Sequence, residues 1–467
     1  RGPLAIDVSI GKSDPVYKAH SYHTKVPHLA IVPSILHYTK PGDVVLDGFC
    51  GTGMTGVAAQ WCGFAPESYW RDSGYENINS DKDISQKGPR RVILSDLSPA
   101  ATFIAANYNL PVDVGTFCTI AEKLLDELEK ELGWMYSTSF QGKRGVISYT
   151  VWSEIFTCPE CTGEIIFYEH ALDDETSRVN EEIECPHCAA NLSKKDLKLV
   201  LSTSYDEISG KTKESPKRIP VLVSYKSGKK KYEKKVDAHD LDVLKRISEL
   251  PYPPNAPTNE FPDMQMMRVG RMKTTNVRHI HDMFLPRSIQ ILAEFFNKVN
   301  RIRDEGLKRA LRIIAQHQFV NASIMNRYRP ASSFGNSPLT GVFYVSSLIA
   351  EANVIDLLRG SINRIKRMGK SSWGKDCRWG SEVIISTSSA AELQLQDNCI
   401  DYIFTDPPFG ENIYYSDLNY LVESWYGVIT DSNPEAIIDR VKQKGVLEYQ
   451  HLMQKCFDEY YRVLKPG

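Results

Sequence analysis

Residues 44–53 read VVLDGFCGTG and combine a short apolar run with a glycine-rich loop. The apolar run predicts a buried strand. Glycines carry no side chain, so the loop lets a ligand approach the backbone at the carboxyl end of that strand. The small residues of 55–61 predict a helix directly after the loop. The pattern indicates the strand–loop–helix unit of an α/β fold.

A second strand is predicted at residues 91–96 (RVILSD), and a helix follows at 98–107, where Pro99 suits the first helical turn. Both predicted strands end on an acid, Asp47 and Asp96. Strand-like residues return at 382–385 and 399–404, after amphipathic stretches at 117–132 and 288–319. The sequence therefore predicts an α/β core that is interrupted by a long insertion and then resumed.

The glycine-rich loop favours a cationic ligand. Residues 51–56 fit the dinucleotide pattern G-x-G-x-x-G, but a pyrophosphate prefers helix amides without a carboxylate nearby, and Asp47 lies beside the loop. A phosphate-binding P-loop would need Lys-Ser/Thr after the glycines. S-adenosylmethionine carries a sulfonium and an ammonium, and Asp96 can accept hydrogen bonds from its ribose hydroxyls. A glycine-rich turn without a ligand is the alternative.

Residues 405–410 (TDPPFG) follow the strand predicted at 399–404 and suit chemistry on a nucleobase. A base amino group is a poor nucleophile. A site must therefore accept hydrogen bonds from its N–H groups and point its lone pair at the methyl carbon. Asp406 and the Pro407 carbonyl can accept these hydrogens, the two prolines hold the backbone extended, and Phe409 offers a stacking face for a flipped base. The chain has no Pro-Cys dipeptide, which disfavours cytosine C5 methylation. An ordinary turn is the alternative here.

Together these motifs resemble those of a known family. Residues 47–53 resemble the D-P-F-C-G-[ST]-G cofactor motif, and residues 406–409 the D-P-P-[YF] catalytic motif, of the amino-group DNA methyltransferases that modify adenine N6 or cytosine N4. Residues 23–27 (HTKVP) look like that family's H-x-x-K-P segment, and residues 91–107 are similar to its second-strand segment. The resemblance covers roughly residues 20–110 and 380–467.

The resemblance implies a Rossmann-like methyltransferase sheet, S-adenosylmethionine as cofactor, and duplex DNA with a flipped base as partner. Its catalytic residues would be Asp406, Pro407, Pro408 and Phe409. Its cofactor-binding residues would be His23, Thr24, Lys25, Pro27, Asp47, Gly48, Phe49, Cys50, Gly51, Thr52, Gly53, Asp96 and Leu97.

The chain departs from the family pattern in three places. Gly48 replaces the usual proline, which loosens the loop. Residues 386–389 offer hydroxyls where the family often has an acid near the adenine ring. Residues 462–467 look like the turn before a fifth strand, so we expect the C-terminal strands of the sheet to be missing from this sequence.

Two C-x2-C pairs predict a zinc ribbon inside the insertion. Cys158 and Cys161 form one pair, Cys185 and Cys188 the other, and four thiolates make a closed tetrahedral site that is structural. The expected domains are 1–110 (cofactor half), 111–145 (helical connection), 146–200 (zinc ribbon), 201–380 (a basic and helical target-recognition region) and 381–467 (catalytic half). Lysines at 229–235 could follow a phosphate backbone or form a solvated loop.

Composition restricts the class of protein. The 467 residues carry a net charge of −2, so any nucleic-acid signal is local. We expect a soluble, unexported protein without a membrane partner, because no apolar run approaches the roughly 18 residues of a spanning helix. Ten cysteines are too few for a disulfide scaffold in a chain of this length, which favours the cytoplasm.

The sequence predicts an S-adenosylmethionine-dependent DNA amino-methyltransferase, adenine N6 favoured over cytosine N4, of the kind found in restriction–modification. Cytosine N4 enzymes more often resemble S-P-P-[YF] at the catalytic motif. RNA is a possible partner, since tRNA guanine-N2 methyltransferases show a similar motif pair, although about forty N-terminal residues leave no room for their RNA-binding domain. A non-catalytic zinc-ribbon nucleic-acid-binding protein and an NAD-dependent oxidoreductase are weaker alternatives.

Overall fold

The computed structural model describes residues 4, 7, 9–72, 86–173, 176, 178–329, 339, 341–371 and 373–466. The chain divides into two compact units. The first unit comprises Arg1–Ala121, Ile302–His317 and Ser361–Gly467, and the second comprises Glu122–Arg301 and Gln318–Gly360. The divisions at 121/122 and 360/361 fall within α6 (Val114–Leu132) and α13 (Val354–Lys370).

A parallel sheet forms the centre of the first unit. Its strands are β1 (Val44–Asp47), β2 (Arg91–Asp96), β14 (Val383–Thr387) and β15 (Tyr402–Ile403), in the order β14-β2-β1-β15. The register pairs Val45 with Val92 on one side and with Tyr402 on the other. The four strands expected from the sequence are confirmed, the last one being only two residues long. A parallel bridge between Ile400 and Leu464 adds a contact at the β15 edge.

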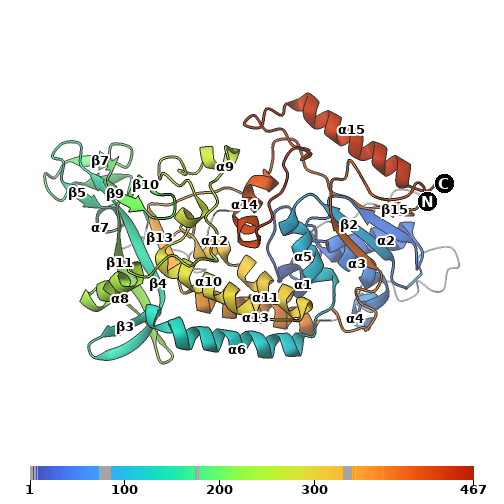
Figure 1. Ribbon diagram of the computed structural model, residues 1–467, viewed down its shortest axis with the longest axis horizontal. Coiled ribbons are helices and arrows are strands. Elements are labelled where there is room, and N and C mark those ends of the chain that lie inside the picture. The colour runs from blue at the N-terminus through green and yellow to red at the C-terminus, as the bar shows by residue number, and fades with distance from the viewer. Residues whose placement is uncertain are drawn as a thin grey trace. The chain divides into compact units, whose positions relative to one another are not determined.

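Alternating side chains of the sheet pack on two different sets of helices. Leu46 packs with Ile400 and Tyr460, the latter from α15 (Val446–Val463). Val45 and Leu94 are buried and belong to the other face, which faces α3 (Met54–Phe64) and α5 (Pro99–Asn109). Helix α2 (His28–Tyr38) packs on α3, and Figure 1 shows α2, α3 and α5 gathered near β2. Burial on both faces explains why the strands are continuous apolar runs.

The remaining elements of the first unit are α1 (Pro15–Lys18), α4 (Glu67–Asp72), α11 (Glu305–Gln316) and α14 (Tyr415–Tyr426). The sequence suggests a surface excursion at 64–90, of which residues 73–85 lie outside the described residues. The helix expected after β2 begins at Pro99, and the Ser98 side chain caps it by accepting a hydrogen bond from the Ala101 N–H.

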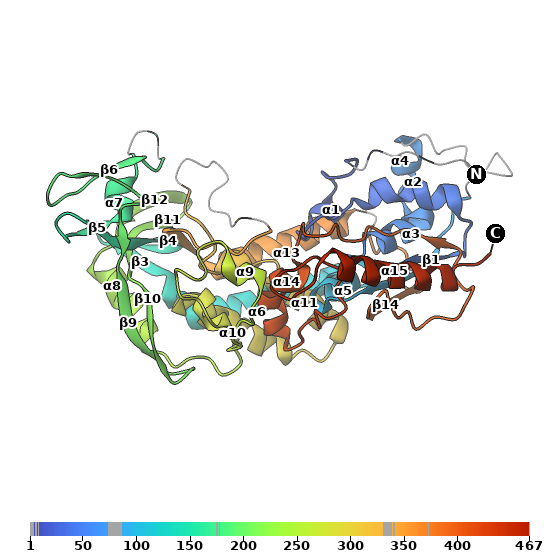
Figure 2. The ribbon, with the colours of Figure 1, turned by 90° about the horizontal axis from the view of Figure 1, so that it is seen from above.

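The second unit is built around the long strand β4 (Lys143–Thr157). β4 pairs antiparallel with β11 (Arg218–Ser227) and β13 (Leu348–Ala352), and β11 pairs with β12 (Lys230–Lys235). Figure 2 shows β4, β11 and β12 beside one another. The other elements are η1 (Gly133–Tyr136), β3 (Ser137–Phe140), β5 (Glu164–Ile166), α7 (Phe167–Ala171), β6 (Glu182–Glu184), β7 (Asn191–Ser193), β8 (Lys198–Leu199), β9 (Leu201–Asp206), β10 (Lys211–Pro216), α8 (Ala238–Ser248), α9 (Gln265–Arg268), η2 (Ile280–Met283), α10 (Pro286–Asn300) and α12 (Phe319–Ala322).

The lysine-rich tract 229–235 is mostly the strand β12 instead of a solvated loop, and one of its lysines is buried. The Lys234 ammonium lies 2.8 Å from the Asp240 carboxylate, and the Lys234 side chain is 2% exposed. Lys234 is therefore unavailable to a phosphate backbone. Across the described part of the chain, no helix is both long and apolar enough to cross a membrane.

Helices α3 and α5 approach closely at Gly56. A Cβ placed on Gly56 would lie 2.4 Å from Asn109 Oδ1 and 2.8 Å from a methyl group of Leu94. Asn109 cannot move away freely, because it accepts a hydrogen bond from the Gln60 side chain and donates one to the Gly53 carbonyl. The glycine is therefore required by packing, although alanine has the higher helix propensity.

We expect Gly56→Ala to lower the free energy of unfolding by about 1–3 kcal/mol, since overpacking a tight helix contact forces its neighbours apart. Gly360→Ala in α13 is the matched control: its Cβ would meet no atom within 4 Å. It should raise the free energy of unfolding by about 0.5–1 kcal/mol. Denaturant unfolding of both variants tests the contrast, and equal effects would contradict it.

Candidate active site

A cavity opens at the carboxyl ends of β1, β2 and β15, with about 1030 Å³ of empty space, open solvent included. Thirteen of the residues predicted from the sequence line it: His23, Thr24, Lys25, Asp47, Gly48, Phe49, Cys50, Gly51, Thr52, Asp96, Leu97, Asp406 and Pro408. Segments far apart in the sequence meet here because β1 is paired with both β2 and β15.

Four predicted residues lie outside the wall of this cavity. Pro407 and Phe409 line a smaller neighbouring hollow, which shares Thr24, Asp406 and Pro408 with the main one. The Phe409 side chain is largely free, since the residue is 67% exposed. Pro27 and Gly53 instead occupy the N-cap positions of α2 and α3.

The glycine-rich loop is anchored to the end of β2. The Gly51 N–H donates to Asp96 Oδ2 at 2.8 Å, and the Cys50 N–H donates to the Ser95 carbonyl at 3.0 Å. Gly51 and Gly53 have φ angles of 48° and 72°, in the left-handed region that favours glycine. These glycines are what allows the chain to turn from β1 into α3 beneath the cavity.

Gly48 is fixed by packing and does not loosen the loop. A Cβ on Gly48 would lie 2.4 Å from the Tyr460 hydroxyl, which is 3.2 Å from Thr405 Oγ1. Tyr460 thus bridges the loop after β1 and the segment before Asp406. A proline at position 48 would displace this tyrosine, so the departure from the family pattern is compensated by a side chain of α15.

Buried carboxylates dominate the electrostatics of the cavity. Asp47 accepts hydrogen bonds from the Phe49 N–H and the Thr55 hydroxyl, yet its burial raises its pKa to about 7. Burial likewise raises the pKa of Asp96 to about 6, and it raises the pKa of Asp406. A cation in the cavity would favour the ionised form of these groups.

Lys25 is the lining lysine from the H-x-x-K-P-like segment, and it is committed to the protein backbone. Its ammonium donates to the carbonyls of Tyr17 and His20 and lies over the Tyr17 ring. Burial lowers the Lys25 pKa to about 7. The lysine holds residues 17–25 together and offsets little of the negative charge of the cavity.

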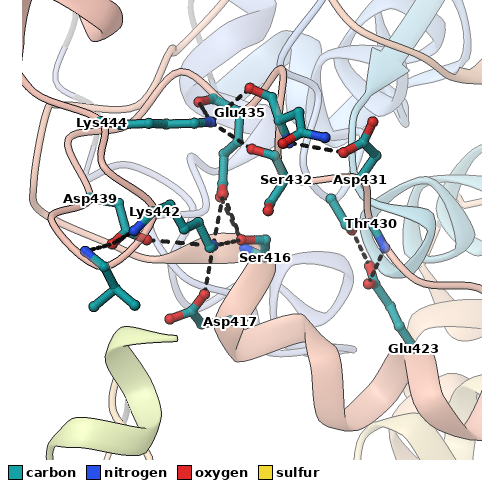
Figure 3. A network of polar contacts seen from close by, with 12 residues as sticks. Ser416, Asp417, Glu423, Thr430, Asp431, Ser432, Glu435, Asp439, Lys442 and Lys444 are labelled. Carbon is teal, nitrogen blue, oxygen red and sulfur yellow. Dashed lines mark hydrogen bonds and ion pairs between the residues drawn. The ribbon is translucent and has the colours of Figure 1, made fainter. Parts of the chain in front are cut away.

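The loop that follows α14 supplies a wall of the cavity and is tied down by one lysine. The Lys442 ammonium donates to Ser416 Oγ and to Asp417 Oδ1, both at 2.8 Å, and lies within 3.6 Å of carboxylate oxygens of Glu435 and Asp439 (Figure 3). Burial opposes the charge of Lys442, but the three carboxylates outweigh it and raise its pKa. Ser416 and Glu435 both line the cavity.

Two further contacts shape the same loop. The Lys444 ammonium donates to the backbone carbonyls of residues 432, 433 and 435. Glu423 accepts hydrogen bonds from the Thr430 N–H, the Thr430 hydroxyl and the Ser98 hydroxyl (Figure 3 shows Glu423 and Thr430). Since Ser98 caps α5, the loop is connected to the N-terminal end of that helix.

Sequence reasoning missed several lining residues. Tyr22, Thr430 and Glu435 belong to the wall, and Tyr22 stacks on Tyr415 with ring centres 6.2 Å apart. Tyr22 directly precedes the H-x-x-K-P-like segment, so that motif could have pointed to it. Residues 427–445 have no periodic pattern, and nothing in the sequence pointed to Glu435.

The four cysteines of the insertion come together. Their four sulfur atoms all lie within 4.8 Å of one another. The sulfurs of Cys158 and Cys188 are 3.8 Å apart, and those of Cys161 and Cys185 are 3.6 Å apart. A zinc–sulfur bond of about 2.3 Å places tetrahedral sulfurs about 3.8 Å apart. The cluster could therefore hold a metal ion.

The two cysteine turns are alike in their backbone. The Thr162 N–H donates to the Cys158 carbonyl, and the Ala189 N–H donates to the Cys185 carbonyl. Thr162 and Ala189 share a left-handed conformation, with φ of 62° and 59°. This internal similarity is what two equivalent knuckles around one ion require.

Comparison with known proteins identifies part of the first unit. Residues 9–63 match the model of the N6_N4_Mtase family, which is described as DNA methylase. Neither a curated protein nor a solved structure matches the chain. The matched segment contains the loop at 47–53 and the residues at 23–27. The match supports the amino-methyltransferase family and, at the level of the family, a DNA N6/N4 methyltransferase.

We expect Lys442→Met to lower the free energy of unfolding by about 3 kcal/mol, because it leaves buried carboxylates without a cation. Asp417 and Asp439 are 1% and 0% exposed, so water cannot replace the ammonium. Thermal or urea unfolding measures this loss.

Lys455→Met on α15 is the control for this comparison, since Lys455 is exposed. Its effect on the free energy of unfolding should stay within about 0.5 kcal/mol. A Lys442 variant as stable as the control would contradict the role of the ion-pair network.

Proposed function

We propose that the chain transfers a methyl group from S-adenosylmethionine to an exocyclic amino group of a DNA base, with adenine N6 favoured over cytosine N4. The observation that carries this proposal is the convergence of Asp47, Asp96 and Asp406 on one cavity at the carboxyl ends of neighbouring parallel strands. The parallel order β14-β2-β1-β15 supports a Rossmann-like methyltransferase sheet.

The residues of the cavity fit S-adenosylmethionine. Its sulfonium and ammonium are cationic, and the cavity holds carboxylates whose pKa values are raised by burial. In the proposal, Asp96 accepts hydrogen bonds from the ribose hydroxyls, while the backbone of residues 48–52 forms the floor. The remaining sequence-predicted cofactor residues, His23 to Lys25 and Leu97, border the same space.

The proposed catalytic residues follow from position. Asp406 lies at the junction of the two hollows, so its carboxylate can accept a hydrogen bond from a base amino group at the cofactor. The Pro407 carbonyl is a second acceptor. Phe409, exposed beside the smaller hollow, offers a face on which a flipped base can stack. Methyl transfer then needs orientation of the lone pair and no covalent intermediate.

Other parts of the proposal concern the rest of the chain. Residues 1–110 and 381–467 would form the two halves of the methyltransferase domain. The connection expected at 111–145 is helical in α6 and η1, but its last residues belong to the strands β3 and β4. Residues 146–200 would form a zinc ribbon with structural Zn²⁺, and residues 201–380 would recognise duplex DNA. A role in restriction–modification and a place in the cytoplasm remain part of this hypothesis.

We expect Asp406→Asn to reduce methyl transfer at least about 100-fold, since a neutral amide accepts the amino hydrogens less strongly and offers one oxygen instead of two. Binding of S-adenosylmethionine should change little. The assay offers labelled S-adenosylmethionine with duplex DNA, single-stranded DNA and tRNA in parallel, followed by analysis of the modified nucleosides.

The control for this assay is Asp458→Asn, which removes a carboxylate from an exposed position of α15. It should retain the wild-type rate. Full activity of Asp406→Asn would overturn the assigned role, and label found in tRNA alone would replace the DNA assignment with an RNA one.

The raised pKa values predict how cofactor binding depends on pH. Asp47 and Asp96, with pKa values of about 7 and 6, are mostly protonated at pH 5 and mostly ionised at pH 8. Ionised carboxylates attract the sulfonium, so S-adenosylmethionine should bind tighter at pH 8. S-adenosylhomocysteine lacks that charge, so its affinity should increase less. The affinity for S-adenosylmethionine divided by that for S-adenosylhomocysteine should therefore rise by about tenfold between pH 5 and pH 8.

Isothermal titration calorimetry at pH 5, 6, 7 and 8 measures this ratio for the wild type. In Asp47→Asn the increase should be smaller, because one titrating carboxylate is lost. A ratio that stays constant across the pH range would contradict an electrostatic contact between these carboxylates and the sulfonium.

A further inference from the structure

A second group of metal-binding residue types lies in the second unit, away from the cysteines in sequence. Asp206 ends β9, and His279 and His281 stand at the start of η2. One ligand atom from each of the three residues lies within 4.8 Å of the others. No motif in the sequence joined them, since Asp206 is more than seventy positions from the histidines.

The geometry of these side chains suits one ion. His281 Nε2 lies 3.0 Å from Asp206 Oδ2. Tetrahedral ligand atoms around a metal with bonds of about 2.0–2.1 Å are about 3.3 Å apart. The His279 and His281 rings stack with centres 5.0 Å apart and planes 21° apart, so the H-x-H spacing brings both imidazoles to the same side of the turn.

Burial separates the cluster from an ordinary surface ion pair. The side chains of His281 and Asp206 are 7% and 8% exposed, and that of His279 is 19% exposed. Two ligands are thus held by packing, while the third reaches solvent and leaves a route for an ion and a water molecule. Ser209 Oγ also donates to Asp206 Oδ2, at 2.7 Å, and fixes the carboxylate.

Asp282 supports the cluster from behind. Its Oδ2 accepts the backbone N–H groups of Arg278 and His279 at 2.9 and 3.0 Å, and its Oδ1 is ion-paired with Lys213 of β10. Its oxygens lie 3.5 Å from His281 Nε2 and 3.8 Å from His279 Nδ1. Two carboxylates and one ammonium therefore surround the two imidazoles.

We propose that Asp206, His279 and His281 form a second metal site, for a divalent first-row transition metal such as Zn²⁺, with water in the fourth position. Imidazole and carboxylate ligands suit this class of metal. The ion would fasten the β9–β10 hairpin to η2 and thereby to α10. The site is independent of the four cysteines and of the proposed methyl transfer.

Cobalt distinguishes the two sites in the full-length chain. A Co²⁺ ion in a four-thiolate site absorbs strongly in the near ultraviolet through sulfur-to-metal charge transfer, whereas one bound by nitrogen and oxygen shows only weak visible bands. We expect the metal-depleted protein to take up two equivalents of Co²⁺, one of them without thiolate bands. Uptake of a single equivalent, with thiolate bands, would overturn the proposal.

Variants of the ligand residues test where the second equivalent of Co²⁺ binds. His279→Asn changes the most exposed of the three ligands, and so should fold. It should lose the second equivalent or bind it at least about tenfold more weakly, with unchanged thiolate bands. Asp206→Asn should behave alike. His239→Asn, an exposed histidine of α8, is the control and should keep both equivalents. Two equivalents retained in both ligand variants would refute the site and leave an ordinary hydrogen bond between His281 and Asp206.

Discussion

The parallel pairing of β1 with both β2 and β15 is the constraint on which the cavity depends. Parallel strands end at the same edge of a sheet, so the register that pairs Asp47 with Leu94 and Leu46 with Ile403 brings the three following loops together. The long insertion between β2 and β15 does not prevent this, because the entropic cost of closing a loop grows only slowly with its length. The sheet thus tolerates a large second unit between its strands.

Buried carboxylates occur in two different settings in the first unit: some have a cationic side chain as partner, and others do not. Asp417 and Asp439 have their charge offset by Lys442, so they hold a loop in place. Asp47 and Asp96 have hydrogen-bond donors, but their pKa values are raised by burial. Keeping such groups costs stability, and perturbed pKa values of this kind cluster at functional sites. In the proposed function, these carboxylates without a cationic partner are the ones that meet the cofactor.

Local patterns made half of this site predictable. The apolar run and glycines at 44–53, the acid after each strand and the spacing of the cysteines all act through neighbours in sequence. The reason for Gly48 could not be predicted, because it is the Tyr460 hydroxyl, which α15 brings from four hundred residues away. Lys442 and Glu435 lie in a loop without periodicity, and the burial of Lys234 depends on Asp240 of the next helix. The roles of these residues depend on tertiary packing, which no local sequence pattern predicts.

In the second unit, two hairpins are held in place in different ways. A two-stranded hairpin is marginally stable in water, and both β6–β7 and β9–β10 are two-stranded. The first of them has an apolar cluster around Cys158 and Cys185, with Ile183 fully buried. The β9–β10 hairpin exposes most of its residues and is attached to η2 by polar contacts from Asp206 and Lys213. Where a hairpin has so little apolar surface to bury, directional contacts from ion pairs or metal ligands must supply the attachment, and the cluster of Asp206, His279 and His281 lies at that junction.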